Sequence, residues 1–271
     1  MMISIRVNSI TETIEESTAF TLRDLRTSGD TTVILNGYAV EKDRVLREGD
    51  EVFLIPKGTL PPQKELEAMM AARHTPGIQQ KLREGRVAIA GLGGLGSHIA
   101  VNLARLGVGY LRLIDFDLVE PSNLNRQHYL IRHLGRYKTE AMREQIAEIN
   151  PFITVDLCTT RMTEENIGSV LSGCSIVCEA FDLPEAKAML VNHIMCTRTQ
   201  TKMCVIASSG MAGAGSGNEI RTVRKMDGFY LCGDFQTEAK EGTGLMAPRV
   251  TICAGHQANM VLRLLTGEEA P

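Results

Sequence analysis

Val87-Ala88-Ile89-Ala90-Gly91-Leu92-Gly93-Gly94-Leu95-Gly96 is the stretch that decides the fold of the larger part of this 271-residue chain. Its first four residues are apolar, as in a strand buried on both faces, and the residues after the glycines keep helical spacing up to Leu106. Glycines at a strand-to-helix turn let a phosphate approach the backbone and the free N–H groups of the helix N-terminus. The stretch therefore predicts a βαβ unit with a nucleotide bound at Gly91, Gly93, Gly94 and Gly96.

Strands and helices continue to alternate after this turn. The sequence predicts strands at 110–114, 154–157, 175–179 and 202–207, and helices near 138–149, 164–171, 184–196 and 250–265. Such alternation predicts an α/β fold with a doubly wound, mostly parallel, Rossmann-like sheet that is covered by helices on both faces.

The N-terminal part of the chain has a different pattern. Predicted strands at 3–7, 32–35 and 51–55 and a short helix at 21–25 form a small α+β unit. Several prolines follow, and residues 63–73 have a helical pattern. We therefore predict a small domain over 1–58, a linker and connecting helix over 59–80, and a nucleotide-binding domain over 81–271.

Composition and charge exclude several classes of protein. No apolar stretch approaches the roughly 20 residues that span a bilayer, and the N-terminus lacks the pattern of a secretory signal, so we expect a cytoplasmic protein without a membrane span. The formal net charge is −3, which does not indicate a large basic surface, and nucleic acid is not an expected partner. The seven cysteines contain no C-x-x-C pair, so neither a disulfide framework nor a cysteine zinc site is expected.

Polar residues gather where the second strand of the βαβ unit ends. Asp115 stands there, in a position where a carboxylate can accept hydrogen bonds from ribose hydroxyls. The loop and helix that follow add Asp117, Asn123, Arg126, Gln127 and Lys138. A guanidinium and an ammonium together would neutralise a polyphosphate, which favours ATP over a nicotinamide cofactor. The alternative is that Arg126 forms a surface salt bridge and Lys138 is a solvated side chain.

These segments, with the run Ser122-Asn123-Leu124-Asn125-Arg126-Gln127, resemble the ubiquitin-activating superfamily, and within it the ThiF/MoeB adenylyltransferases of sulfur-carrier proteins. The resemblance implies a nucleotidyltransferase that uses MgATP to adenylate the C-terminal glycine carboxylate of a carrier and releases pyrophosphate. It implies that ATP is bound by the four glycines, Asp115, Asp117, Asn123, Arg126, Gln127 and Lys138, and that the catalytic residues are Arg126, Lys138 and Asp182.

Asp182 is the Mg²⁺ ligand that the resemblance implies, but the asparagine that accompanies it in the family is replaced here by Leu183. Asp182 could instead cap the helix that is predicted to begin at Pro184. The zinc-binding cysteine pairs of many relatives are also missing, so zinc is not expected. Cys232 is a candidate for a covalent link to the carrier, with an inert buried thiol as the alternative.

The resemblance further implies a homodimer, in which an arginine from upstream of the first strand completes the site. Arg73 is the candidate for this residue, although its spacing differs from that of the family.

Residues 3–58 resemble the carrier itself, a ThiS/MoaD-like β-grasp domain. A working carrier ends in Gly-Gly with a free carboxylate, whereas this segment continues through Pro56-Lys57-Gly58-Thr59, and its carbonyl is already in an amide. We therefore expect the N-terminal domain to be a docking or regulatory module, or else a structural appendage, and the substrate to be a separate ThiS-like carrier of thiamine biosynthesis. The alternatives are an enzyme similar to tRNA threonylcarbamoyladenosine dehydratase, an NAD-dependent dehydrogenase, and a non-catalytic nucleotide-binding scaffold.

Overall fold

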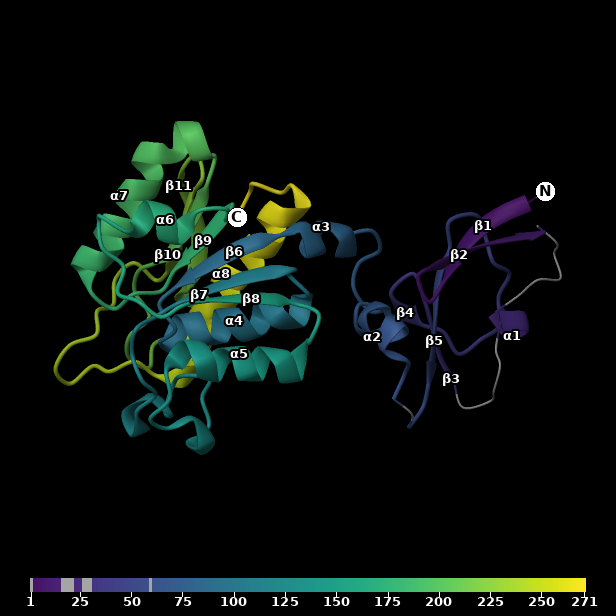
Figure 1. Cartoon of the computed structure of the whole chain (residues 1–271), viewed down its shortest axis with the longest axis horizontal. Helices are drawn as coiled ribbons and strands as arrows, with labels where there is room; N and C mark the ends of the chain where they lie inside the picture. Colours follow the sequence, from purple (N-terminus) through teal and green to yellow (C-terminus); the bar gives the residue numbers. More distant parts are fainter. Residues whose placement is uncertain (1, 16–21, 26–30, 59) are drawn as a thin grey trace. The chain divides into compact units, whose positions relative to one another are not determined.

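The computed structural model of the chain describes residues 2–15, 22–25, 31–58 and 60–271. They form two compact units, Met1–Gln80 and Lys81–Pro271 (Figure 1). Within the described part of the chain, every helix is too short or too polar to cross a bilayer. Each unit has its own sheet and its own core.

Unit 1 is built on a five-stranded sheet in the order β2-β1-β5-β3-β4. Its strands are β1 (Met2–Val7), β2 (Ile10–Glu15), β3 (Thr31–Leu35), β4 (Tyr38–Ala39) and β5 (Glu51–Pro56), and its first helix is α1 (Leu22–Leu25). The neighbouring strands β1 and β5 are parallel, and the other pairs are antiparallel. The three predicted strands are confirmed, whereas β2 and β4 were not predicted from the sequence.

Helix α2 (Gln63–Met70) is an integral part of unit 1. One face of the sheet packs on its own core, which includes Ile5 and Val52, while the other face presents Ile34 and Phe53. The latter two side chains are each 2% exposed because Ala68 of α2 and the nearby Ala72 pack against them. Most of the segment that was predicted as a linker and connecting helix therefore belongs to the fold of unit 1.

Unit 2 contains a seven-stranded sheet in the order β11-β12-β10-β9-β6-β7-β8. Its strands are β6 (Arg86–Ala90), β7 (Tyr110–Ile114), β8 (Thr154–Cys158), β9 (Ile176–Glu179), β10 (Cys204–Ser208), β11 (Arg221–Met226) and β12 (Phe229–Gly233). All neighbouring strands are parallel except β11 and β12, which form an antiparallel hairpin at the edge. The predicted doubly wound, mostly parallel sheet is confirmed.

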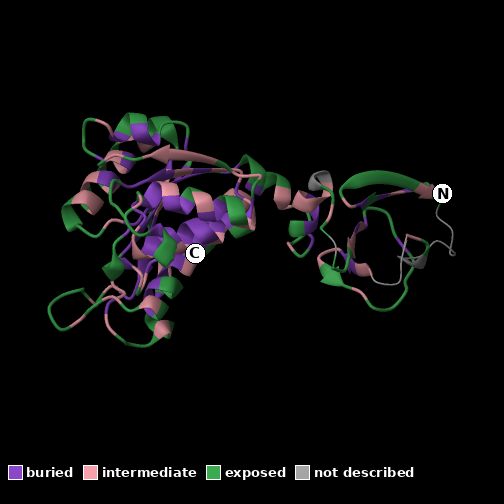
Figure 2. Ribbon diagram, turned by 60° about the horizontal axis from the view of Figure 1, so that its bottom comes forward, coloured by how far each residue is buried: buried purple, intermediate pink, exposed green. Residues whose placement is uncertain are grey.

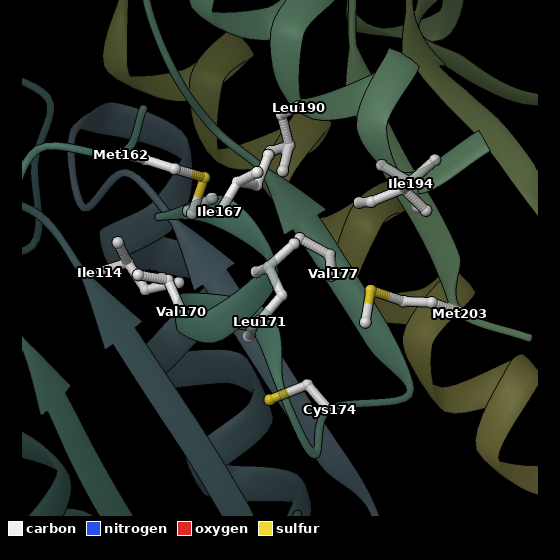
Figure 3. Close-up of a cluster of buried hydrophobic side chains, with 13 residues drawn as sticks. Ile114, Met162, Ile167, Val170, Leu171, Cys174, Val177, Leu190, Ile194 and Met203 are labelled. Carbon is white, nitrogen blue, oxygen red and sulfur yellow. The ribbon is translucent and has the colours of Figure 1, made fainter. Parts of the chain in front are cut away.

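Helices cover both faces of this sheet (Figures 1 and 2). One layer contains α4 (Gly94–Leu106), α5 (Lys138–Ile149) and α8 (Ala247–Thr266), and the other contains α6 (Ile167–Leu171) and α7 (Pro184–Thr201). Figure 3 shows the core under the second layer, where Ile167, Leu190 and Ile194 meet Val177 of β9. The remaining elements are α3 (Gln79–Glu84) and the 3₁₀ helices η1 (Pro121–Asn123), η2 (Ile131–His133) and η3 (Gly217–Glu219).

The order of the strands reverses between β6 and β9. The chain goes from β6 to β7 in one direction along the sheet, and from β9 to β10 in the other. The connections that leave the carboxyl ends of β6 and β9 therefore diverge. In open α/β sheets such a switch point is where ligands bind.

Candidate functional site

The glycine turn lies at this switch point, and two of its glycines are required by the chain itself. Gly91 has a φ of +93°, and a Cβ at this position would lie 2.7 Å from the carbonyl oxygen of Ala180. A Cβ on Gly96 would lie 1.8 Å from the carbonyl oxygen of Gly91. The turn and the first residues of α4 therefore pack too closely for any side chain at these two positions.

Gly93 differs from these two glycines, because neither its φ nor the neighbouring atoms of the chain require a glycine there. It has a φ of −73° and occupies the N-cap position of α4 without a side-chain cap. A Cβ there would meet only the Gln127 amide nitrogen, at 3.9 Å. Open space in front of a helix N-terminus with free N–H groups is what a phosphate needs, so the turn fits the triphosphate of ATP.

Asp115 holds the glycine turn in place. Its carboxylate is 7% exposed and accepts hydrogen bonds from the backbone N–H groups of Leu92, at 2.6 Å, and Asp117, at 2.8 Å. Burial raises the pKa of Asp115, and Lys138 opposes this rise. A carboxylate has about four acceptor sites, so these two bonds leave capacity for ribose hydroxyls.

Lys138 is the first residue of α5 and is 5% exposed. Its ammonium forms an ion pair with Asp117 at 2.7 Å and lies 4.0 Å from the carboxylate of Asp115. The alternative that Lys138 is a solvated side chain is therefore wrong. A buried ammonium beside the carboxylate that holds the glycine turn is suitably placed to neutralise a phosphate.

Arg126 lies beside the same turn. A Cβ built on Gly94 would lie 3.8 Å from the Cγ of Arg126. Its guanidinium donates to the carbonyl oxygen of Ser122, at 3.0 Å, and to the side chain of Asn125, at 2.9 Å, while its Nε is buried without a partner among the described residues. The loop thus orients Arg126, and the buried Nε–H remains available to a ligand.

Asn123 and Gln127 have different roles in this loop. The side-chain oxygen of Asn123 accepts a hydrogen bond from the backbone N–H of Glu120 at 3.0 Å. The backbone carbonyl oxygen of Asn123 accepts from the backbone N–H groups of Arg126 and Gln127. Gln127 is 8% exposed, and its Oε1 has no partner within the described chain. Asn123 therefore stabilises the loop through its hydrogen bonds, and Gln127 offers an unpaired polar atom near Gly93.

Asp182 is exposed in the connection between β9 and α7. Leu183 occupies the N-cap position of α7, which has no side-chain cap, so Asp182 does not cap this helix. The described residues contain no cluster of three metal-binding side chains. Mg²⁺ is commonly held by one or two carboxylates together with substrate phosphates, so Asp182 fits this ion only in the presence of a nucleotide.

An ion pair that was not predicted from the sequence joins the end of β9 to α7. Glu179, the last residue of β9, is fully buried, and both of its oxygens lie 3.1 Å from the ammonium of Lys187 on α7. Its signal in the sequence is a carboxylate at the end of the apolar strand Ile176-Val177-Cys178-Glu179, followed by a lysine in the next helix.

A second buried ion pair lies where β12 ends. Arg249, on the first turn of α8, donates to the carboxylate of Asp234 and to the carbonyl oxygen of Ser216, the latter at 2.7 Å. Asp234 also accepts from the backbone and hydroxyl of Thr237. These contacts fix the start of the 234–247 connection, for which no structure was predicted from the sequence.

The structure does not support a covalent role for Cys232. The thiol is 0% exposed, and burial raises its pKa to about 11. The thiolate that would attack an adenylate is therefore scarce and inaccessible. The alternative of an inert buried thiol fits these observations. Arg73, the candidate from upstream, is exposed in the turn that follows α2 in unit 1.

Comparisons with known proteins agree with this architecture. The sequence model of the ThiF family matches residues 66–271, and that of the ThiS-like ubiquitin family matches residues 3–58. The chain is 32% identical to a molybdopterin-synthase adenylyltransferase of Salmonella typhimurium, over 69% of this chain and 75% of that one. It is 29% identical to the sulfur carrier protein ThiS adenylyltransferase of Escherichia coli, over 71% and 77%.

Other relatives carry a different name. A tRNA threonylcarbamoyladenosine dehydratase of Haemophilus influenzae is 34% identical over 51% of this chain, and the chain spans about half of its length, 52%. The E. coli tRNA dehydratase solved in complex with ATP has a TM-score of 0.68 at 22% identity, over 77% of this chain and 97% of that one. This structural similarity concerns the fold, whereas the sequence match covers most of the chain: the protein belongs to the ThiF family and carries a ThiS-like domain at its N-terminus.

Proposed function

We propose that this protein is an ATP-dependent adenylyltransferase. Its substrate would be the C-terminal glycine carboxylate of a separate ubiquitin-like sulfur-carrier protein, and pyrophosphate would be released. The observation that carries the proposal is the buried ammonium of Lys138, together with Arg126, beside a glycine turn that is open at Gly93. Relatives named as adenylyltransferases, and a neighbour solved with ATP, support the nucleotide.

The chemistry of this reaction matches the residues of the site. Attack of a carboxylate on the α-phosphate brings two anions together, so the site has to supply positive charge rather than a strong base. Lys138, Arg126 and the N–H groups of α4 supply that charge. Mg²⁺, held by Asp182 and the phosphates, would add further neutralisation.

We favour a ThiS-type carrier, and therefore thiamine biosynthesis, because this chain carries a ThiS-like domain of its own. We further propose that the enzyme acts in the cytoplasm as a homodimer. A second candidate, activation of a carboxylate on tRNA, is favoured by the relatives named tRNA threonylcarbamoyladenosine dehydratase. The net charge of −3 argues against an extended surface for RNA.

The test is ATP–pyrophosphate exchange with the full chain. We expect exchange only when a ThiS-like carrier ending in Gly-Gly is added, and none with the same carrier lacking its last glycine. Exchange that depends instead on threonylcarbamoylated tRNA would support the second candidate. Absence of exchange with both substrates, in a protein that binds ATP, would contradict the proposed enzyme.

A further inference from the structure

The ion pair between Glu179 and Lys187 joins three elements around the loop that carries Asp182. Glu179 ends β9, Lys187 lies in the first turns of α7, and Ser208 ends β10. The ammonium of Lys187 donates to both carboxylate oxygens of Glu179, at 3.1 Å, and to the hydroxyl of Ser208, at 3.2 Å. An ammonium has three N–H donors, so all of them are used within the chain. Lys187 is therefore not a free cation for a ligand.

The same carboxylate fixes the backbone that leads to Asp182. The N–H of Phe181 donates to Glu179 Oε1 at 2.7 Å, and the N–H of Ser208 donates to Oε2 at 3.4 Å. Ala180 and Phe181 lie against the glycine turn, because a Cβ on Gly91 would be 2.7 Å from the Ala180 carbonyl oxygen and 3.3 Å from the Phe181 ring. Ala180 is held beside the turn by its own N–H, which donates to the carbonyl oxygen of Ala90 at 2.8 Å, and Glu179 then fixes the backbone at Phe181, the residue before Asp182.

We propose that Glu179, Lys187 and Ser208 position the Ala180–Leu183 connection against the glycine turn, so that Asp182 can share a Mg²⁺ ion with the phosphates of ATP. Lys187 is then a positioning residue rather than a catalytic one. This inference rests on the proposed function, because it assigns Asp182 to the metal–phosphate contact of that site.

The carboxylate of this pair is fully buried, whereas the ammonium is partly exposed. Glu179 is 0% exposed, and the Lys187 side chain is 26% exposed. Burial raises the pKa of Glu179, and Lys187 opposes this effect. A carboxylate in this environment loses its charge or changes its partners when the ammonium is removed, and both responses weaken the hydrogen bond that it accepts from the N–H of Phe181. A displacement of about 1 Å of a group in an active site, caused by a mutation elsewhere, can lower the rate about 100-fold.

The experiment measures how much Mg²⁺ tightens the binding of ATP to the full chain, by calorimetry with and without the ion. We expect the wild type to show this tightening and Asp182→Asn to lose it. Lys187→Met should reduce it at least tenfold while ATP affinity without Mg²⁺ stays close to that of the wild type. Lys187→Arg should retain most of it, and Lys202→Met, an exposed lysine just after the same helix, should retain all of it.

Two further variants separate positioning from folding. Ser208→Ala removes one hydrogen bond without leaving a buried charge, and we expect a smaller loss of the Mg²⁺ effect. Glu179→Leu with Lys187→Met removes both charges, so it should fold well and still lack the Mg²⁺ effect. A normal Mg²⁺ effect in Lys187→Met or in the double variant would overturn the inference, and so would a wild type without any Mg²⁺ effect.

The outcome is independent of the exchange assay. If the Mg²⁺ effect follows Lys187 but no carrier or tRNA supports exchange, the positioning inference stands and the proposed function fails. If exchange is carrier-dependent but the Mg²⁺ effect ignores Lys187, the function stands and the inference fails.

Discussion

Replacement of Lys138 by methionine tests the electrostatic design of the site most directly. The change keeps most of the buried aliphatic volume and removes the ammonium, which leaves Asp117 and Asp115 without their cation. The Asp117 side chain is 49% exposed, so loss of that pair costs at most about 1 kcal/mol. Asp115 is 7% exposed, and removing the partner of a fully buried charge typically costs about 3–5 kcal/mol.

Asp115 keeps its two backbone N–H donors in this variant and lies 4.0 Å from the ammonium in the native protein. We therefore place its contribution below the range for a fully buried pair, and expect Lys138→Met to lower the free energy of unfolding of unit 2 by about 2–3 kcal/mol at pH 7. It should also abolish ATP–pyrophosphate exchange, because the phosphates lose their buried cation.

The sign of the pH dependence follows from Asp115. Burial already raises its pKa above the ordinary value, and loss of Lys138 raises this pKa further. The native state then binds more protons than the unfolded state, so the penalty is present at pH 7 and disappears as the pH falls below the ordinary aspartate value of about 3.9. Lys138→Met should therefore approach the stability of the wild type in acid.

Urea denaturation followed by the near-ultraviolet circular dichroism of tyrosine is a suitable assay, because of the five tyrosines only Tyr38 lies in unit 1. The matched control is Asp115→Asn combined with Lys138→Met, which should recover most of the stability at pH 7 but not the exchange activity. Equal losses at neutral and acid pH, or no recovery in the double variant, would refute the reasoning.

Three further predictions address other parts of the chain. Gly96→Ala should abolish ATP binding, because its Cβ would lie 1.8 Å from the Gly91 carbonyl oxygen and the turn would have to open; unchanged affinity in a binding titration would contradict this. Phe53→Ala should destabilise unit 1 by about 3–5 kcal/mol, because it leaves a cavity under α2; hydrogen exchange in β3 and β5 measures the effect, and a loss below about 1 kcal/mol would mean that α2 does not cover this face. Cys232→Ala should retain carrier-dependent exchange, because the thiol is buried with a raised pKa; loss of exchange in a folded variant would restore its covalent role.

The sequence predicted those features whose signals are local. The βαβ unit follows from an apolar strand, a glycine turn and a helix that ends at Gly107, where the φ is +79°. The β11–β12 hairpin was missed, although Asp227-Gly228 between two alternating segments is a turn signal. Helix α2 was predicted, but its packing on the sheet of unit 1 was not, because that contact joins segments with no shared local pattern.

The candidate site was likewise predicted where the signal is local and missed where distant segments meet. Residue types predicted that Lys138 and Arg126 lie near the glycines, and the structure places both beside that turn. The sequence did not show that Asp115 holds the turn through the N–H of Leu92, or that Lys187 forms an ion pair with Glu179. These contacts join the ends of different strands to the starts of helices, and only the topology of the sheet brings them together.

The fold of unit 1 also bears on which molecule supplies the carboxylate. Strand β5 ends at Pro56, and α2 begins at Gln63 and returns onto the sheet of the same unit. The segment that corresponds to the tail of a carrier therefore lies within the chain, with its carbonyl in an amide, and Ile34 and Phe53 are covered by α2. A module whose terminal carbonyl is in an amide cannot be the acyl substrate of its own chain. In the proposed reaction, the carboxylate has to come from a second molecule.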